Sequence, residues 1–364
     1  MSSASLPRIA IVHDSLVTSG GAERVLAFMH EAFPSAPIYT AAYVPKDTFP
    51  EFRSATVVPL PWSGLVESER RLKALFPLWV VGFARLNLRA FDVILSSTTW
   101  GAKFVSHGPS VRHVCYCYAP TRLLWNPKAY NVARAPVGPL SRLVGLARGP
   151  LRALDVRAMR RIDQVATSCR NMARAIASCY GLAATVIHPP VRLSDYRVGT
   201  ERGSFYLSVS RLIAHKRVDL AIEACRRLGR KLVVVGDGPD AARLRTLADG
   251  SVTFLGRISD EALRRLYATC RALIFPSDED YGLAPLEAQA SGCPVIAYGA
   301  GGVLETVVEG QAGVFFREQS PLALVETILT FERMQFDPVA VRESVRRFDV
   351  ERFKQELSSF VLSS

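Results

Sequence analysis

The sequence predicts an α/β protein made of two doubly wound domains. Its 364 residues suffice for two domains of roughly 150 residues each. In both halves, short apolar runs alternate with helical segments, a pattern typical of parallel sheets with helical crossovers. Residues 1–190 hold 22 Lys and Arg against 10 Asp and Glu, whereas residues 191–364 hold 23 of each. The whole net charge of +12 therefore lies in the first half, and we predict the domain boundary near residue 190.

Composition narrows the class of protein further. A hydrophobic content of 49% supports large buried cores, and the longest apolar stretch, residues 74–88, is too short for a membrane span and contains Arg85. The N-terminus, MSSASLPR, lacks the charged and apolar regions of a signal peptide, so we expect a cytoplasmic protein. The seven cysteines have no paired metal-ligand spacing, which favours a reducing compartment. We expect the alternating Cys115 and Cys117 to pack in the core from one strand face.

The order of elements follows from these runs. In the first half we expect a helix over 25–33 and strands over 8–13, 37–43, 55–58, 91–97, 111–118, 162–168 and 185–188. In the second half we expect strands over 204–210, 231–235, 252–255, 272–276, 294–298 and 314–316. The helices expected there cover residues 218–228, 283–291, 321–334 and 337–362.

Residues 271–302 organise the candidate site. A buried strand, a polar loop and a helix start follow one another, and a helix N-terminus offers unpaired N–H groups and a positive dipole end to an anion. Gly282 lets a ligand approach the backbone closely. Glu279 and Glu287 bracket this turn, and carboxylates accept hydrogen bonds from hydroxyl groups. The pattern predicts a ligand that carries both phosphate and several hydroxyls.

Two cations follow the strand at 204–210. Arg211 and Lys216 stand at the end of that strand and before the next helix, where they can clamp a pyrophosphate. The competing interpretation is a pair of solvated basic residues on a loop.

These segments resemble a known family. The string FPSDEDYGLAPLEAQASGCPVIA, with Glu279 and Glu287 separated by seven residues, is similar to the signature of retaining GT-B glycosyltransferases of family 4, and SVSRLIAHKRVDLAIEA matches that family's Arg-x4-Lys pattern. The resemblance covers essentially the whole chain. It implies two Rossmann-like domains facing across a cleft: an acceptor domain over 1–190, a nucleotide-sugar domain over 191–340, and a final helix over 341–364 packing back toward the first domain.

The resemblance also implies roles for residues. Glu279 would contact the donor sugar, Glu287 the nucleotide ribose, and Arg211 with Lys216 the donor diphosphate. The loop VHDSLVTSGGAERV resembles the family's N-terminal loop, which faces donor phosphates and acceptor. The remaining donor-side residues that it implies are Gly20, Gly21, Gly236, Gly256, Arg257, Gly282 and Leu283, and Asp14 is expected on the acceptor or sugar side.

One position departs from the family. Residues 118–122 resemble a segment of the mannosyltransferase-like branch that reads His-Thr-Pro-x-Arg, but Tyr118 stands at the place of the histidine, before Arg122. Tyrosine can still bind a sugar hydroxyl, although the histidine contact cannot be carried over. His107 and His113 do not align as replacements, and we expect structural or surface roles for them.

The leading expectation is transfer of a hexose, mannose from GDP-mannose above all, with retention, to a glycan or lipid-linked acceptor in bacterial surface polysaccharide assembly. Because cations face the diphosphate, we expect no cofactor and no obligate metal. A competing hypothesis is a metal-dependent transferase in which Asp278 and Asp280 form an Asp-x-Asp site. A non-catalytic basic protein that binds membranes or nucleic acid would also account for the charge, although no RNA or helix-turn-helix motif favours nucleic acid.

Two basic segments of the first half indicate what kind of partner the protein binds. Residues 61–89 mix aromatic and basic side chains, as an interfacial membrane helix or a core helix with a solvated face would. Residues 132–161 are rich in arginine, which suits anionic lipid or a solvated helix face. We expect a peripheral location at the inner face of the cytoplasmic membrane and an acceptor that is lipid-linked or otherwise anionic, and no nucleic acid as partner.

Overall fold

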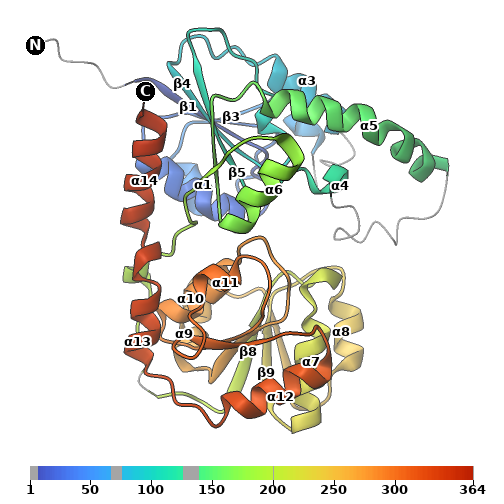
Figure 1. The fold of residues 1–364 in the computed structure, drawn as a ribbon, viewed down its shortest axis with the longest axis vertical. Helices are drawn as coiled ribbons and strands as arrows, with labels where there is room; N and C mark the ends of the chain where they lie inside the picture. Colours follow the sequence, from blue (N-terminus) through green and yellow to red (C-terminus); the bar gives the residue numbers. More distant parts are fainter. Residues whose placement is uncertain (1–6, 67–75, 126–138, 200, 364) are drawn as a thin grey trace, which may run out of the picture. The chain divides into compact units, whose positions relative to one another are not determined.

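A computed structural model describes residues 7–66, 76–125, 139–199 and 201–363. The chain divides into two compact units (Figure 1). The first combines the described residues up to Pro189 with those from Glu351 onward, and the second is Pro190–Val350. Each unit is an α/β layer structure built on its own parallel sheet, so the fold class predicted from the alternation is confirmed.

The first unit is built on seven parallel strands in the order β3-β2-β1-β4-β5-β6-β7. Their bounds are β1 Ile9–His13, β2 Ile38–Thr40, β3 Val57–Pro59, β4 Val93–Thr98, β5 Arg112–Cys117, β6 Gln164–Thr167 and β7 Thr185–Val186. The chain runs outward from β1 to β3 and then returns to the other side of β1. The neighbouring β1 and β4 therefore form the switch point, beyond whose carboxyl ends open α/β sheets bind ligands.

Helices cover both faces of this sheet (Figure 1). They are α1 Gly21–Ala32, α3 Phe76–Ala84, α4 Arg122–Trp125, α5 Pro139–Met159, α6 Arg170–Tyr180 and α14 Val350–Leu362. Trp79 and Phe83 of α3 are fully buried against β1 and β4. Cys115 and Cys117 are buried together against α5 and α6, so their predicted core role is confirmed. From α14, the ring of Phe353 packs edge-on against Tyr116.

The second unit is built on six parallel strands in the order β10-β9-β8-β11-β12-β13. The strands are β8 Phe205–Val209, β9 Lys231–Val235, β10 Val252–Gly256, β11 Ala272–Phe275, β12 Val295–Tyr298 and β13 Gly313–Phe316. The helices are α7 Val218–Leu228, α8 Ala241–Leu247, α9 Asp260–Thr269, α10 Leu283–Ala290, α11 Val303–Thr306, α12 Pro321–Phe331 and α13 Pro338–Ser344. The switch point here lies between β8 and β11.

Alternate residues of each strand enter different cores. Ile274 and Ile296 face α7, α8 and α12, whereas Leu273 and Val295 face α9, α10 and α13. A sheet buried on both faces explains why these strands read as continuous apolar runs instead of alternating ones.

The helix predicted over 337–362 is interrupted. It consists of α13, a short 3-10 turn at Arg346–Phe348, and α14. Between the last two, Asp349 is extended, with φ −65° and ψ 149°. Its carboxylate accepts a hydrogen bond from the Leu193 N–H at 3.2 Å, and the Phe348 carbonyl accepts one from the Val191 N–H at 2.9 Å. The helix breaks because this segment pairs with the chain that enters the second unit.

The two basic segments are only partly described. Residues 67–75 and 126–138, with Arg134 among them, lie outside the described residues. Within 61–89, the aromatic residues Trp79 and Phe83 belong to the core, as the core-helix interpretation requires. None of the helices in the described ranges is long and apolar enough to cross a bilayer.

Candidate active site

An ion pair occupies the switch point of the second unit. Lys216 lies in the short helical turn that follows β8, and Glu279 lies in the loop that follows β11. The Lys216 Nζ and a Glu279 carboxylate oxygen are 2.5 Å apart, with 17% and 19% of the two side chains exposed. The Ser277 hydroxyl donates to the same oxygen at 2.7 Å. Two of the residues selected from the sequence thus meet where the fold places ligands.

The charge of Glu279 depends on these neighbours. Burial alone would raise the pKa of its carboxyl, but the Lys216 ammonium, the Ser277 hydroxyl and the nearby His215 together hold that pKa below its ordinary value. Glu279 is therefore ionised at neutral pH and presents an acceptor for hydroxyl donors.

Two glycines shape the backbone around Glu279. Gly301 has φ +70°, pairs with Glu279 through a backbone bridge, and would clash with the Glu279 carbonyl if it carried a Cβ. Gly282, with φ +88°, is the N-cap of α10, and a Cβ there would lie 2.8 Å from the Phe275 ring. The loop between β11 and α10 is therefore fixed by positions that only glycine fills without strain.

The turn that carries Lys216 has an unusual backbone. Arg217, the next residue, has φ +51°, which a non-glycine side chain adopts at a cost of roughly 1–2 kcal/mol. It ends the 3-10 turn and begins α7, and its guanidinium pairs with Asp219 at 3.3 Å. Arg211 lies at the opposite end of this loop and is exposed.

The helix α10 positions the second carboxylate. Leu283 is its first residue, and Glu287 follows one turn later. The hydroxyl of the fully buried Tyr267, on α9, donates to Glu287 Oε2 at 3.0 Å. Gly236 and Gly256, both expected on the donor side, lie next to one another at the ends of the neighbouring strands β9 and β10: the Gly236 N–H donates to the Gly256 carbonyl at 2.8 Å. The next residue, Arg257, is exposed.

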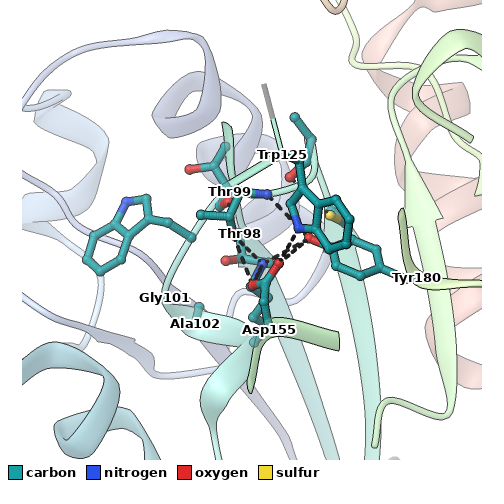
Figure 2. Close-up of polar contacts among 12 residues, drawn as sticks. Thr98, Thr99, Gly101, Ala102, Trp125, Asp155 and Tyr180 are labelled. Carbon is teal, nitrogen blue, oxygen red and sulfur yellow. Dashed lines mark hydrogen bonds and ion pairs between the residues drawn. The ribbon is translucent and has the colours of Figure 1, made fainter. Parts of the chain in front are cut away.

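In the first unit, Asp14 holds a loop in place. It follows β1, and its buried carboxylate accepts six hydrogen bonds of 2.6–3.0 Å from the last residue of β4 and the segment after it. The donors, several of which are labelled in Figure 2, are the Thr98 hydroxyl, both the N–H and hydroxyl of Thr99, and the N–H groups of Trp100, Gly101 and Ala102. Asp14 thus shapes the switch point of this unit through its own protein contacts.

Tyr118 joins three elements. Its hydroxyl donates to the Ala22 carbonyl in the first turn of α1 at 3.1 Å, and it lies 3.0 Å from the Ser97 hydroxyl. Ser97 in turn lies 3.0 Å from His13 Nδ1. Just before Ala22, Gly20 begins α1, with its N–H bound to Glu23, and Gly21 is the first helical residue. Tyr118 therefore connects β4 and β5 to the glycine turn.

A buried polar network lies beside this loop (Figure 2). Lys103 and Asp155 form an ion pair of 2.6 Å with neither side chain exposed. Lys103 also donates to the Thr121 hydroxyl at 2.6 Å, immediately before Arg122. Asp155 accepts hydrogen bonds of 2.7–3.0 Å from Thr121, Trp125 and Tyr180. The network fixes the loop after β5 to α5 and α6.

Sequence reasoning missed this network, although one signal was present. Asp155 is the only acidic residue between 139 and 159, within an arginine-rich helix. A lone carboxylate at such a position indicates a buried partner. Its partner Lys103 had no comparable signal, because a Lys among apolar residues reads equally well as exposed.

Two buried histidines make the first unit sensitive to acid. Burial lowers the pKa of His13 to about 4 and that of His113 to about 3, from an ordinary value of 6.5. Below pH 6.5 the unfolded chain binds protons that the folded unit does not, so the free energy of unfolding falls as pH falls. At pH 5.5 each histidine should account for a loss of about 1.4 kcal/mol relative to pH 7.5.

Urea unfolding at pH 7.5 and 5.5 measures this loss. His113→Gln and His13→Gln should each remove a similar share of the pH dependence, because the glutamine does not titrate, and His30, whose pKa burial also lowers, should account for a smaller remainder. A double variant that keeps more than half of the wild-type pH dependence would show that groups other than His13 and His113 cause it.

The described residues bring no three His, Cys, Asp or Glu side chains into a group that could hold a metal ion. Asp278, of the Asp-x-Asp hypothesis, is exposed, and Asp280 is half-buried.

Comparison with known families finds similarity within the second unit. Residues 198–348 match the family model "Glycosyl transferases group 1". Over 150 residues the chain is 33% identical to a glycogen synthase of Pseudomonas paraeruginosa, covering 38% of this chain and 29% of that one. Over 144 residues it is 34% identical to a GDP-mannose-dependent alpha-mannosyltransferase of Corynebacterium glutamicum, covering 38% and 34%. It is 30% identical over 204 residues to the human alpha-1,3/1,6-mannosyltransferase ALG2, covering 47% and 48%. The chain thus spans less than half the length of each relative.

Solved structures extend the likeness to both units. HepE of Anabaena, determined with UDP and glucose, superimposes with a TM-score of 0.74 at 17% identity over 99% of this chain and 100% of that one. A sucrose-phosphate synthase of Thermosynechococcus elongatus gives 0.76 at 18% identity over 97% and 98%. The resemblance read from the Glu279–Glu287 segment is therefore confirmed: residues 198–348 match the glycosyl transferases group 1 family model, and the chain as a whole has the two-domain α/β fold of GT-B proteins.

Proposed function

We propose that this protein is a retaining glycosyltransferase that uses a nucleotide diphosphosugar. The observation that carries the proposal is the Lys216–Glu279 ion pair at the switch point of a group 1 domain. A cation for phosphate and an ionised carboxylate for hydroxyls lie in contact there, which suits a ligand that joins a diphosphate to a sugar.

The proposed roles follow from charge. Breaking the bond between the anomeric carbon and the diphosphate leaves negative charge on the departing phosphate, which Lys216 and Arg211 would stabilise. Glu279 would hold the sugar hydroxyls, and Glu287 the ribose hydroxyls. Because two cations are available for the diphosphate, we propose that no metal ion is obligatory.

We further propose mannose, carried by GDP, as the transferred sugar, and a glycan or lipid-linked acceptor in bacterial surface polysaccharide assembly. Two relatives named as mannosyltransferases, one of them GDP-mannose-dependent, support the donor. The excess of positive charge in residues 1–190 supports an anionic acceptor.

Thermal unfolding with GDP, UDP, ADP and TDP, each with and without EDTA, tests the donor. A nucleotide at ~100 times its dissociation constant should stabilise the second unit by about 2.7 kcal/mol. A shift with GDP that survives EDTA supports the proposal. A shift that requires metal would favour a metal-dependent transferase that uses Asp278 and Asp280, and no shift with any nucleotide would contradict the proposed function.

We propose peripheral association with the inner face of the cytoplasmic membrane through basic residues of the first unit. Arg157, Arg160 and Arg161, at the end of α5 and just after it, are all exposed. The protein should cosediment with vesicles that contain anionic lipid, and not with neutral ones, at 0.1 M salt. Equal binding to short oligonucleotides would favour a nucleic-acid-binding protein instead.

A further inference from the structure

The contact between Tyr267 and Glu287 joins the candidate site to the apolar core of the second unit. Tyr267 is fully buried on α9, packed with Leu273 and Ala288 in a core of the second unit. Its hydroxyl reaches out of that core to donate to Glu287 Oε2 at 3.0 Å.

The backbone of Tyr267 is itself held rigidly. One nitrogen of the Arg202 guanidinium donates to the carbonyls of Tyr267 at 2.8 Å and Ala268 at 3.1 Å. The other nitrogen donates to the Ser291 carbonyl, just after α10, at 2.8 Å. Arg202 therefore fixes the end of α9 relative to the end of α10, the helix that carries Glu287. The tyrosine hydroxyl cannot move far from the carboxylate that it binds.

We propose that Tyr267 is a positioning residue that orients the Glu287 carboxylate for the ribose hydroxyls of the nucleotide; this rests on the proposed function. A glutamate side chain loses considerable rotamer freedom when a ligand fixes it. A rigid donor that fixes one carboxylate oxygen beforehand lowers that cost of binding. The tyrosine hydroxyl donates without adding a charge to the site, and hydrogen bonds to carboxylates are stronger than those to neutral acceptors.

The test compares ribonucleoside with 2′-deoxy and 3′-deoxy nucleoside diphosphates by calorimetry. The nucleotide is the one that binds wild-type protein. Tyr267→Phe should weaken binding of the ribonucleotide by about fivefold to tenfold, with little effect on the deoxy form that lacks the bound hydroxyl. The preference for ribose should therefore fall by the same factor.

Tyr206→Phe is a matched control. Tyr206 is also fully buried in the second unit, and its hydroxyl also donates to a glutamate, Glu332, at 2.9 Å. Unlike Glu287, Glu332 is not a residue of the candidate site. It forms an ion pair with Arg230 at 2.8 Å, which connects the end of α12 to the segment before β9. Tyr206→Phe should lower stability without changing the preference for ribose.

A double-mutant cycle shows whether Tyr267 acts through Glu287. In Tyr267→Phe/Glu287→Ala the ribose preference should equal that of Glu287→Ala alone, because the tyrosine then has no carboxylate to orient. Effects that multiply would overturn the inference.

The outcomes also separate the inference from the function. If no nucleoside diphosphate binds wild-type protein, the proposed function fails. If one binds with a ribose preference that Tyr267→Phe leaves intact, only the positioning role fails.

Should Tyr267→Phe not fold, Glu287→Gln replaces it as the test variant. The Tyr267 hydroxyl would then bind the new amide oxygen and leave the NH₂ group toward the ribose, so the preference should persist within about threefold. A loss as complete as in Glu287→Ala would overturn the role.

Discussion

Replacing Lys216 by methionine should lower sugar transfer by about a hundredfold to a thousandfold, the usual effect of removing one donor from a developing negative charge. The Lys216 ammonium already lies 2.5 Å from Glu279. Its loss removes a cation from the proposed diphosphate site and leaves the Glu279 carboxylate buried without that partner, which raises the pKa of Glu279. The measurement is the rate of transfer from GDP-mannose, or from whichever nucleotide sugar carries the nucleotide that the unfolding experiment identifies.

Two variants control for charge and folding. Lys231→Met removes an exposed positive charge from the same unit and should leave the rate within about twofold. Lys216→Met/Glu279→Gln should recover stability, because the uncompensated charge is gone, but not turnover. Transfer by Lys216→Met at a tenth of the wild-type rate or more would mean that Lys216 does not contact the diphosphate.

The sequence predicted the second unit well because its strands are buried on both faces. The run at 272–276 corresponds to β11, Ala272–Phe275, and the helix expected over 283–291 corresponds to α10, Leu283–Ala290. Gly282 and Gly292 flank that helix, and both have positive φ. Glycines at such positions mark helix ends clearly in a sequence.

The contacts of the site were less predictable. Glu279 and Lys216 could be selected from spacing and resemblance. Their contact with each other depends on β8 lying next to β11 in the sheet, and the sequence does not reveal this because β9 and β10 come between those strands along the chain. Tyr267 reads as an ordinary apolar position of an amphipathic helix. The role proposed for Tyr267 depends on the contact of its hydroxyl with Glu287, and the periodicity of apolar residues along a helix does not show such a contact.

Asp14 illustrates the same limit in the first unit. It was selected for the acceptor or sugar side because it follows β1 in a loop that resembles the family. In the structure its carboxylate binds six donors of the end of β4 and the segment after it. Position along the chain placed the residue at the switch point, and tertiary packing determined what it binds.

The buried pair Lys103–Asp155 should produce the largest change in stability. Lys103→Met leaves the fully buried Asp155 carboxylate without its counterion, which costs about 3–5 kcal/mol of unfolding free energy. For a unit of this size, that corresponds to a fall in melting temperature of roughly 6–20 °C. The measurement is calorimetric unfolding of the full chain, in which the transition of the first unit shifts.

An exposed pair of the same unit gives the comparison. Arg8 and Asp92 are 3.2 Å apart with 65% and 49% of their side chains exposed, so Arg8→Ala should lower the melting temperature far less than Lys103→Met does. Equal losses for Arg8→Ala and Lys103→Met would contradict a special role for the buried pair.

Replacing both partners separates stability from geometry. Lys103→Met/Asp155→Leu removes both buried charges and should recover most of the lost stability, as apolar replacements of buried ion pairs generally do. It cannot restore the hydrogen bonds that Thr121, Trp125 and Tyr180 make with Asp155. If the network serves to fix the loop that carries Tyr118 and Arg122, the double variant should be stable and still transfer sugar at least tenfold more slowly than wild type. A stable double variant with full activity would show that the network supports the fold and not the position of this loop.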